Sequence, residues 1–270
     1  MAADGLTSNH WKIAGRKLPI IGSFLLSRVR APAFSFLLVA LLLVLPGASQ
    51  ARVFWTIAGG ETSGVLASDA AWTRAYSAML RINSGRAGLE VWSARLSLTE
   101  AVEALRAKVR QGGGEIWFTG VGEMVWGIGC DGERVFRFLV TATQNPRSSL
   151  VFQLSQSFED FTASLTPPQE HLLKAAPAYP NSEEKSFLAS EATRTEMATS
   201  TAGSPPADVK NFYAERLPGG GWAPVFQPGK GLDVYLRGNE VILVSAESAG
   251  DSGGSVIMLL HKPLTSAEHN

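Results

Sequence analysis

An internal repeat constrains the fold of this chain more than any other feature of its sequence. Residues 97–114 and residues 204–221 align at a constant offset of 107, and each segment ends in three consecutive glycines. In this alignment Leu105 meets Phe212. Self-similarity at a fixed spacing indicates that one supersecondary unit occurs more than once. We therefore predict that the chain contains two copies of one unit.

Each aligned segment carries the signals of a capped helix. Ser97 and Glu100 predict a capping box, and Ser204 followed by Pro205 predicts an N-cap with proline at the first helical position. The terminal glycines fit the left-handed conformation that often ends a helix. We expect one amphipathic helix in each copy.

Strand signals follow each helix. Their matching positions in the two copies lie 106 residues apart, one fewer than the 107 residues between the helices. Runs with strand-like periodicity match between the copies: 126–130, 135–140 and 150–154 correspond to 232–236, 241–246 and 256–260. Turn signals separate the runs, as in Asp131-Gly132 and Arg237-Gly238. A further strand-like run precedes each helix, at residues 89–96 and 194–201.

This order of elements predicts an α+β fold. We expect two tandem βαβββ modules after an N-terminal signal peptide, each a mainly antiparallel sheet with one helix packed on a face, because that arrangement buries the apolar side of both elements. The predicted parts are a signal peptide at 1–51, a spacer at 52–71, a first module at 72–157, a linker at 158–178, a second module at 179–263 and a tail at 264–270. The alternative for the spacer is an added strand at 53–57, and within the linker a short helix would follow Thr166.

The N-terminal part of the chain predicts export. Phe34–Leu45 is an almost unbroken apolar run, preceded by two arginines and followed by Pro46-Gly47. As a helix it would span about 18 Å, well short of a hydrocarbon core of about 30 Å. Ser49 and Ala51 are small residues at the positions that a signal peptidase requires for cleavage after Ala51. We expect a periplasmic or secreted protein.

The alternative is an uncleaved signal anchor in the inner membrane, which would be the protein's membrane contact. Residues 1–28 precede an otherwise conventional signal peptide, so we interpret them as a gene-start artefact. Leu26 or Val29 would then mark the true start.

Charge argues against nucleic acid as a partner. Five of the 24 basic and one of the 24 acidic side chains lie within residues 1–51, which leaves 19 basic and 23 acidic residues in the rest. This balance does not predict the basic surface that binding to nucleic-acid phosphates requires. Cys130 is the sole cysteine, and it alternates with Trp126 and Ile128 in a predicted strand, so we expect a buried thiol rather than a reactive one.

One string resembles a catalytic motif. Gly250-Asp-Ser252-Gly-Gly254 matches the surroundings of the nucleophile in chymotrypsin-like proteases, but the rest of that machinery has no counterpart in the sequence. In the repeat it falls on the turn at 145–148, so we interpret it as a glycine-rich hairpin turn. We predict no catalytic residue.

No cofactor or metal site is predicted either. Gly59–Gly64 lacks the lysine of a phosphate-binding loop, and His171, His261 and His269 are not within metal-ligand spacing of one another. The tryptophans concentrate in the first module, where we interpret them as core, with a sugar- or peptide-binding face as the alternative.

The second copy also carries a resemblance. The helix segment 208–217, followed by Gly221-Trp222 and a β-meander, looks like the small helix-on-sheet modules of periplasmic accessory proteins. The paired helix-grip domains of the C lipoprotein in the outer-membrane barrel-assembly machine are one example. The resemblance covers a helix and a turn, and this chain departs from it by having no lipidation cysteine.

These observations predict an exported, non-catalytic cell-envelope protein whose duplicated modules bind another protein in an assembly or secretion system. The alternative is a small-ligand-binding or enzymatic site in a cleft between the modules. Asp131, Glu133 and Glu240 near the meander turns are the clustered carboxylates that would serve such a site.

Overall fold

The structure is a computed structural model that describes residues 11–13, 16–18, 65–66, 68, 70–225, 232–250 and 253–264. It divides into two units, residues 1–56 and 57–270. In the first unit β1 (Trp11–Ile13) pairs with β2 (Arg16–Leu18) in an antiparallel hairpin. The rest of the predicted signal peptide, most of the spacer and nearly all of the tail lie outside the described residues.

The second unit begins with a half that spans residues 72–165, called the first half below. Its elements are β3 (Trp72–Ile82), β4 (Gly85–Ala94), α3 (Leu98–Gln111), β5 (Glu115–Val121), β6 (Met124–Cys130), β7 (Arg134–Ala142), β8 (Ser149–Ser157) and α4 (Phe158–Leu165). Two strands therefore precede α3, and four strands follow it.

Residues 183–263 form the second half. Its elements are β9 (Glu183–Ser190), β10 (Thr195–Ala202), α5 (Pro206–Gly219), β11 (Ala223–Pro224), β12 (Asp233–Arg237), β13 (Glu240–Ser248) and β14 (Ser255–Pro263). Again two strands precede the helix and four follow it.

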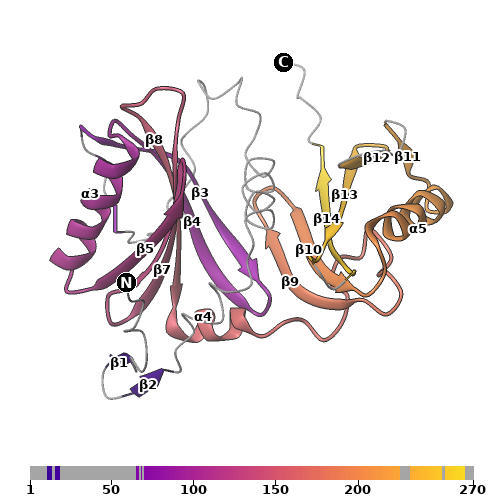
Figure 1. The fold of residues 1–270 in the computed structure, drawn as a ribbon, viewed down its shortest axis with the longest axis horizontal. Helices are drawn as coiled ribbons and strands as arrows, with labels where there is room; N and C mark the ends of the chain where they lie inside the picture. Colours follow the sequence, from indigo (N-terminus) through magenta and orange to yellow (C-terminus); the bar gives the residue numbers. More distant parts are fainter. Residues whose placement is uncertain are drawn as a thin grey trace, which may run out of the picture. The chain divides into compact units, whose positions relative to one another are not determined.

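One antiparallel sheet contains the twelve strands of both halves, in the order β11-β12-β13-β14-β10-β9-β3-β4-β8-β7-β6-β5. β3 and β9 pair where the halves meet, from Leu80 with Ser190 to Ile82 with Leu188. Outward from this junction the order is β3-β4-β8-β7-β6-β5 in the first half and β9-β10-β14-β13-β12-β11 in the second, so the strands of the two halves take corresponding places. Figure 1 shows α3 beside the strands of the first half and α5 beside those of the second.

α3 begins with the capping box that the sequence predicts. Ser97 Oγ accepts a hydrogen bond from the backbone N–H of Glu100, and the Glu100 carboxylate accepts one from the N–H of Ser97 at 2.8 Å. Buried Ala101, Leu105 and Val109 follow at spacings of four and form the core-facing side of the helix. The prediction of this helix and its cap is confirmed.

α5 differs from its prediction by one residue. Pro205, not Ser204, is the N-cap, and no side chain caps this helix. Its core-facing residues are Val209, Tyr213 and Leu217, which match the buried positions of α3 at an offset of 108. Tyr213, not Phe212, therefore takes the place of Leu105.

The number of strands also differs from the prediction, which placed one strand before each helix and three after it. β3 was missed because a bulge between Arg74 and Tyr76 breaks its alternation. Its buried side chains, Trp72, Tyr76 and Leu80, then repeat every four residues, as in a helix. β5 and β11 were also missed. As end strands of the sheet they bury few side chains, so their alternation of apolar and polar residues is weak.

The linker contains a helix earlier than expected. A short helix was predicted after Thr166, whereas α4 ends at Leu165 and starts directly after β8. Ser157 caps it by accepting from the backbone N–H of Asp160 at 3.0 Å.

The α+β fold class is confirmed, with a mainly antiparallel sheet and three helices among the described residues. Within the same residues, none of the helices is both long and apolar enough to span a bilayer.

Candidate functional site

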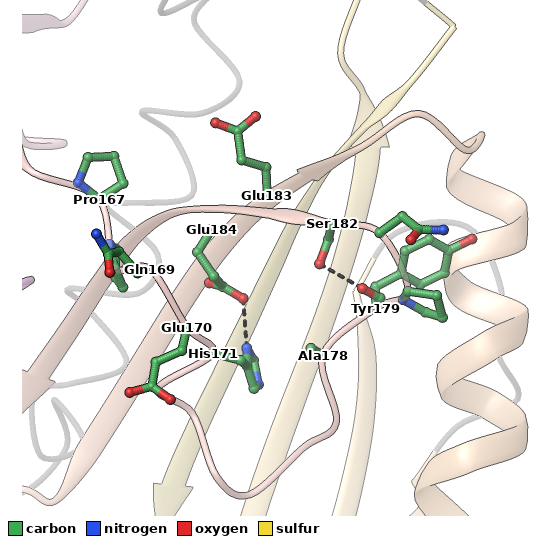
Figure 2. A pocket seen from close by; sticks show the side chains of 12 residues that line it. Pro167, Gln169, Glu170, His171, Ala178, Tyr179, Ser182, Glu183 and Glu184 are labelled. Carbon is green, nitrogen blue, oxygen red and sulfur yellow. Dashed lines mark hydrogen bonds and ion pairs between the residues drawn. The ribbon is translucent and has the colours of Figure 1, made fainter.

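One hollow on the described surface lies at the linker. Residues 167–171 and 178–184 line a cavity of about 640 Å³, which is shown in Figure 2. The first stretch follows α4, and the second leads into the start of β9. Because both stretches are rich in polar side chains, the cavity has a polar lining.

His171 is the central side chain of this cavity. Its Nδ1 lies 2.7 Å from Glu184 Oε1, and its Nε2 lies 3.0 Å from the carbonyl oxygen of Ala176. Figure 2 shows the ring directed toward the Glu184 carboxylate. The Ala176 carbonyl can only accept, so Nε2 donates to it, while Nδ1 faces the Glu184 carboxylate. Both ring nitrogens are used within the protein.

The surrounding loop is anchored to the core of the second half. Leu173 and Ala176 are buried in that core, and the Tyr213 hydroxyl donates to the carbonyl oxygen of Pro177 at 3.2 Å. Burial raises the pKa of Tyr213 well above its usual value, so its hydroxyl keeps the proton. Tyr179 packs edge-on against Phe212 with ring centroids 5.1 Å apart. The cavity therefore has a fixed wall.

The arrangement can bind but has no activated group. A general base needs a free ring nitrogen within reach of the substrate, and His171 has none. Ser182 Oγ donates to the Tyr179 carbonyl at 2.7 Å, so it also serves the loop. Glu170 and Glu183 add negative charge at the rim, although Lys185 pairs with Glu183 at 2.6 Å. The negative rim would favour a ligand with cationic or hydrogen-bond donor groups.

His261 is the centre of a second polar cluster, on β14. Its ring nitrogens lie 3.9 Å from Glu196 Oε2 and 3.6 Å from Glu240 Oε1, beyond hydrogen-bond distance. The ring meets Trp222 edge-on at 6.1 Å, and the Arg237 guanidinium lies 4.4 Å above the same indole. Among the described residues, no group of His, Cys, Asp and Glu is arranged to hold a metal ion.

The three carboxylates considered in the sequence do not share a site. Asp131 and Glu133 lie at the turn between β6 and β7, and Glu240 begins β13. In the sheet six strands lie between β13 and β7. Asp131 pairs with Arg134 at 2.8 Å, and Glu240 pairs with Arg237 at 2.9 Å. Asp131 and Glu240 therefore stabilise two different turns.

The charges of these two carboxylates are stabilised locally. Partial burial raises the pKa of Asp131, but hydrogen bonds from Arg134 and nearby backbone outweigh it and hold the pKa below its usual value. The hydrogen bond from Arg237 lowers the pKa of Glu240. Both groups are ionised at neutral pH and bound to arginines, which suits a structural role.

Cys130 is buried on β6, as predicted, and burial raises the pKa of its thiol. A raised pKa lowers the fraction of nucleophilic thiolate.

Asp251 and Ser252 of the protease-like string lie outside the described residues, as do His269 and Gly59–Gly64. Of the residues around this string, Gly254 accepts through its carbonyl oxygen from the N–H of Ala249 at 2.8 Å. This bond lies next to the pair of Ser248 at the end of β13 and Ser255 at the start of β14.

The tryptophans whose burial the structure describes divide into two classes. Trp72 and Trp92 of the first half are buried, which confirms their interpretation as core, and Trp222 of the second half is buried too. Trp117 on β5 is 44% exposed, and Trp126 on β6 is half-buried. Part of the aromatic set is therefore on the surface of the first half, which the sequence alone did not distinguish.

Sequence reasoning missed two residues with structural consequences. Glu184, the partner of His171, lies 13 positions away in the chain without a motif that links them. Asn83 joins the halves, because its side chain accepts from the N–H of Phe187 at 2.7 Å and donates to the Ser164 carbonyl at 2.6 Å. The sequence signal at this place is the turn-forming run Asn83-Ser-Gly85, and asparagine tolerates the positive φ of 53° found there.

Comparison with protein-family models, with curated proteins and with solved structures gives no match to this chain. The resemblance of the second copy to periplasmic helix-on-sheet modules therefore stays a prediction.

Proposed function

We propose that this chain is an exported, non-catalytic protein of the cell envelope, built from two copies of one module, that binds another protein in an assembly or secretion system. The observation that carries the proposal is the repeated connectivity of the two halves. Each has two strands, a helix and four strands, and the strands take equivalent places in the sheet.

Register supports a duplication. The β7–β8 ladder starts with Arg134 opposite Ser157, and the β13–β14 ladder starts with Glu240 opposite Pro263, so both partners shift by 106. Convergence to the same topology would not require the same residue offset. Repeated modules without an assembled catalytic group are typical of binding proteins.

The polar groups of the described surface support a role in binding rather than catalysis. In the loop cavity, His171 and Ser182 are bound to neighbouring carbonyl and carboxylate groups. Asp131 and Glu240 are held by arginines. An enzyme would instead direct such groups toward a shared reacting atom.

Export is tested by expressing the full chain in a Gram-negative host. The protein should appear in the osmotic-shock fluid and begin at Arg52, because the apolar run is too short to span the membrane. A chain without residues 1–51 is the control and should stay in the cytoplasm. A full-length, membrane-bound product would contradict cleavage and favour the signal anchor.

Partner binding is tested in the same strain. Chemical cross-linking of intact cells, followed by affinity purification, should give a defined adduct with the exported form and not with the cytoplasmic control. Exported protein that stays free of adducts at natural expression levels would contradict the binding role.

Small-ligand binding is a second candidate, because the loop cavity has a volume within the usual range of ligand sites, roughly 300–1,000 Å³. It belongs to the linker and β9, not to a cleft formed by both copies. Glu170→Gln and Glu183→Gln should weaken any ligand with cationic or donor groups, measured by calorimetry. In the enzymatic version of this candidate His171 would not serve as the base, because both of its ring nitrogens are bound within the protein.

A further inference from the structure

We propose that β5, at one end of the sheet, is a strand-addition site that binds an extended segment of a partner protein with apolar side chains at alternate positions. The inference rests on the proposed binding function and names the surface and the chemistry of the partner.

The edge of β5 is long and regular. Its seven residues pair with β6 without a shift in register, from Glu115 with Cys130 to Val121 with Met124, and β5 is the last strand in the sheet. In an antiparallel sheet, every second residue of an end strand directs its N–H and C=O away from the sheet. These groups form a template for another strand.

β5 lacks several of the features that normally protect an edge, and Glu115 at its start is its one charged residue. Its sequence contains no lysine, arginine or proline, and the ladder has no bulge. Natural proteins use such features, or a covering element, to prevent edge-to-edge pairing. The side chains of Glu115, Trp117 and Thr119 are exposed at this edge.

The equivalent edge of the second half is closed. β11 contains two residues, and one of them is Pro224, which has no N–H to donate. β11 and β5 occupy corresponding places at opposite ends of the sheet. Of two equivalent edges, one therefore has the properties of a protected strand and the other those of a binding strand.

Side chains next to β5 select an apolar segment. Trp117 lies opposite Ile128, and Thr119 opposite Trp126, so these residues share one face of the sheet. A strand added to β5 would place alternate side chains on this face beside the exposed indole of Trp117. A hollow of about 470 Å³, lined by Arg110 and residues 113–117, lies at the start of the strand and can take a further side chain.

The size of the edge favours a flexible segment over a second copy of this chain. Seven residues extend over about 23 Å, and a strip of that length and roughly 10 Å width buries on the order of 500 Å² in total. Stable interfaces between folded proteins bury about 1,200 Å² or more. A segment can add contacts by reaching the hollow and the Trp117 face, whereas a rigid copy meets the strip alone.

The state of the free protein is the first test. The exported protein should sediment as a monomer, and half of the β5 amides should exchange with deuterium as fast as those of a loop. Protected β5 amides in a monomer would show that the chain covers its own edge, for example with the strand-like residues 53–57. Protected amides in a dimer would show that a second copy binds there. Either result overturns the proposal.

Binding is tested with a displayed library of random twelve-residue peptides. Selection on the protein should enrich peptides with apolar residues at alternate positions. In synthetic versions, N-methylation of alternate amides should weaken binding at least about tenfold, because each such amide donates to the β5 edge, while methylation of the amides between them should have little effect. Failure to enrich any peptide, or equal sensitivity of all amides, overturns strand addition.

Two matched variants locate the site. Trp117→Lys introduces the residue that natural edges use for protection and should weaken peptide binding by about tenfold or more. Leu236→Lys is the control, at an apolar position beside β11 that is 37% exposed against 44% for Trp117, and it should bind as the wild type does. Thermal unfolding should be the same for both variants. Equal binding by Trp117→Lys and the wild type would refute the assignment to β5.

The two proposals fail in different ways. If Trp117→Lys still forms the cross-linked adduct in cells, the binding function stands and the β5 site is wrong. If the wild type forms no adduct and selects no peptide, both proposals are wrong.

Discussion

Asn83 offers the sharpest test of how the two halves are joined. It is buried at the turn between β3 and β4, and it donates through its side chain to the Ser164 carbonyl at the end of α4. The same side chain accepts from the N–H of Phe187 on β9. Asn83→Ala removes both bonds and leaves one donor and one acceptor buried.

The expected cost follows from these two groups. Leaving a buried polar group without a partner costs about 1–3 kcal/mol, so the two together cost about 2–6 kcal/mol. Alanine also tolerates the positive φ of 53° less well than asparagine does, which adds about 1 kcal/mol. We expect Asn83→Ala to lower the free energy of unfolding by about 3–7 kcal/mol.

Asn181 provides a matched control. It has a φ of 57° and is exposed, so Asn181→Ala changes the backbone preference without removing a buried hydrogen bond. Urea unfolding, followed by circular dichroism, should give a cost of about 1 kcal/mol for this variant. If Asn83→Ala costs no more than Asn181→Ala, the junction does not depend on these bonds and the reasoning is wrong.

Three further predictions concern single positions. Asp131→Asn should lower the free energy of unfolding by less than about 1 kcal/mol at pH 7, because the ion pair with Arg134 is partly exposed. Since the pKa of Asp131 is lowered in the folded state, this difference from the wild type should disappear in urea titrations as the pH falls below about 4. A difference that grows at acidic pH would contradict this. Tyr213→Ala should lower the free energy of unfolding by about 3–5 kcal/mol and Phe212→Ala by less than about 2 kcal/mol, because Tyr213 is fully buried and Phe212 is half-buried. The reverse order would restore the alignment of the two helices at an offset of 107. A fluorophosphonate probe should leave Ser252 unlabelled, and stoichiometric labelling would revive the protease interpretation.

Local signals predicted α3, α5 and the inner strands. Ser97 and Glu100 define the start of α3 because the capping box is made within four residues. The ranges predicted at 135–140 and 241–246 fall inside β7 and β13. Such features depend on neighbours in the chain, so a single sequence contains the information for them.

The helix alignment failed by one residue because two adjacent aromatics compete for one position. Phe212 and Tyr213 both suit an apolar helix face, and Ser204 and Pro205 both suit its start. The sequence alignment was fixed by the glycines, whereas packing places Tyr213 in the core. The correct offset of 108 follows from which side chains are buried, and that depends on tertiary structure.

The candidate sites could not be predicted because they are formed by pairing between distant segments. His171 and Glu184 meet through the fold of a loop, and Asn83 reaches Phe187 over 104 positions. The openness of β5 depends on its being last in the sheet, which no local pattern of Glu115–Val121 reveals. Position in the sheet, not residue type, makes this strand a candidate.

The proposed duplication and the proposed binding edge constrain each other. Two identical halves that meet through β3 and β9 would leave two identical open edges, and molecules with two such edges pair into open chains. The ladders near the middle of each half keep the same register, while the end strands differ, with seven residues in β5 and two in β11. The halves therefore differ at the two end strands, where identity would cause polymerisation. A closed β11 edge leaves one strand-addition site per molecule, so the expected complex contains one copy of this protein and one partner segment.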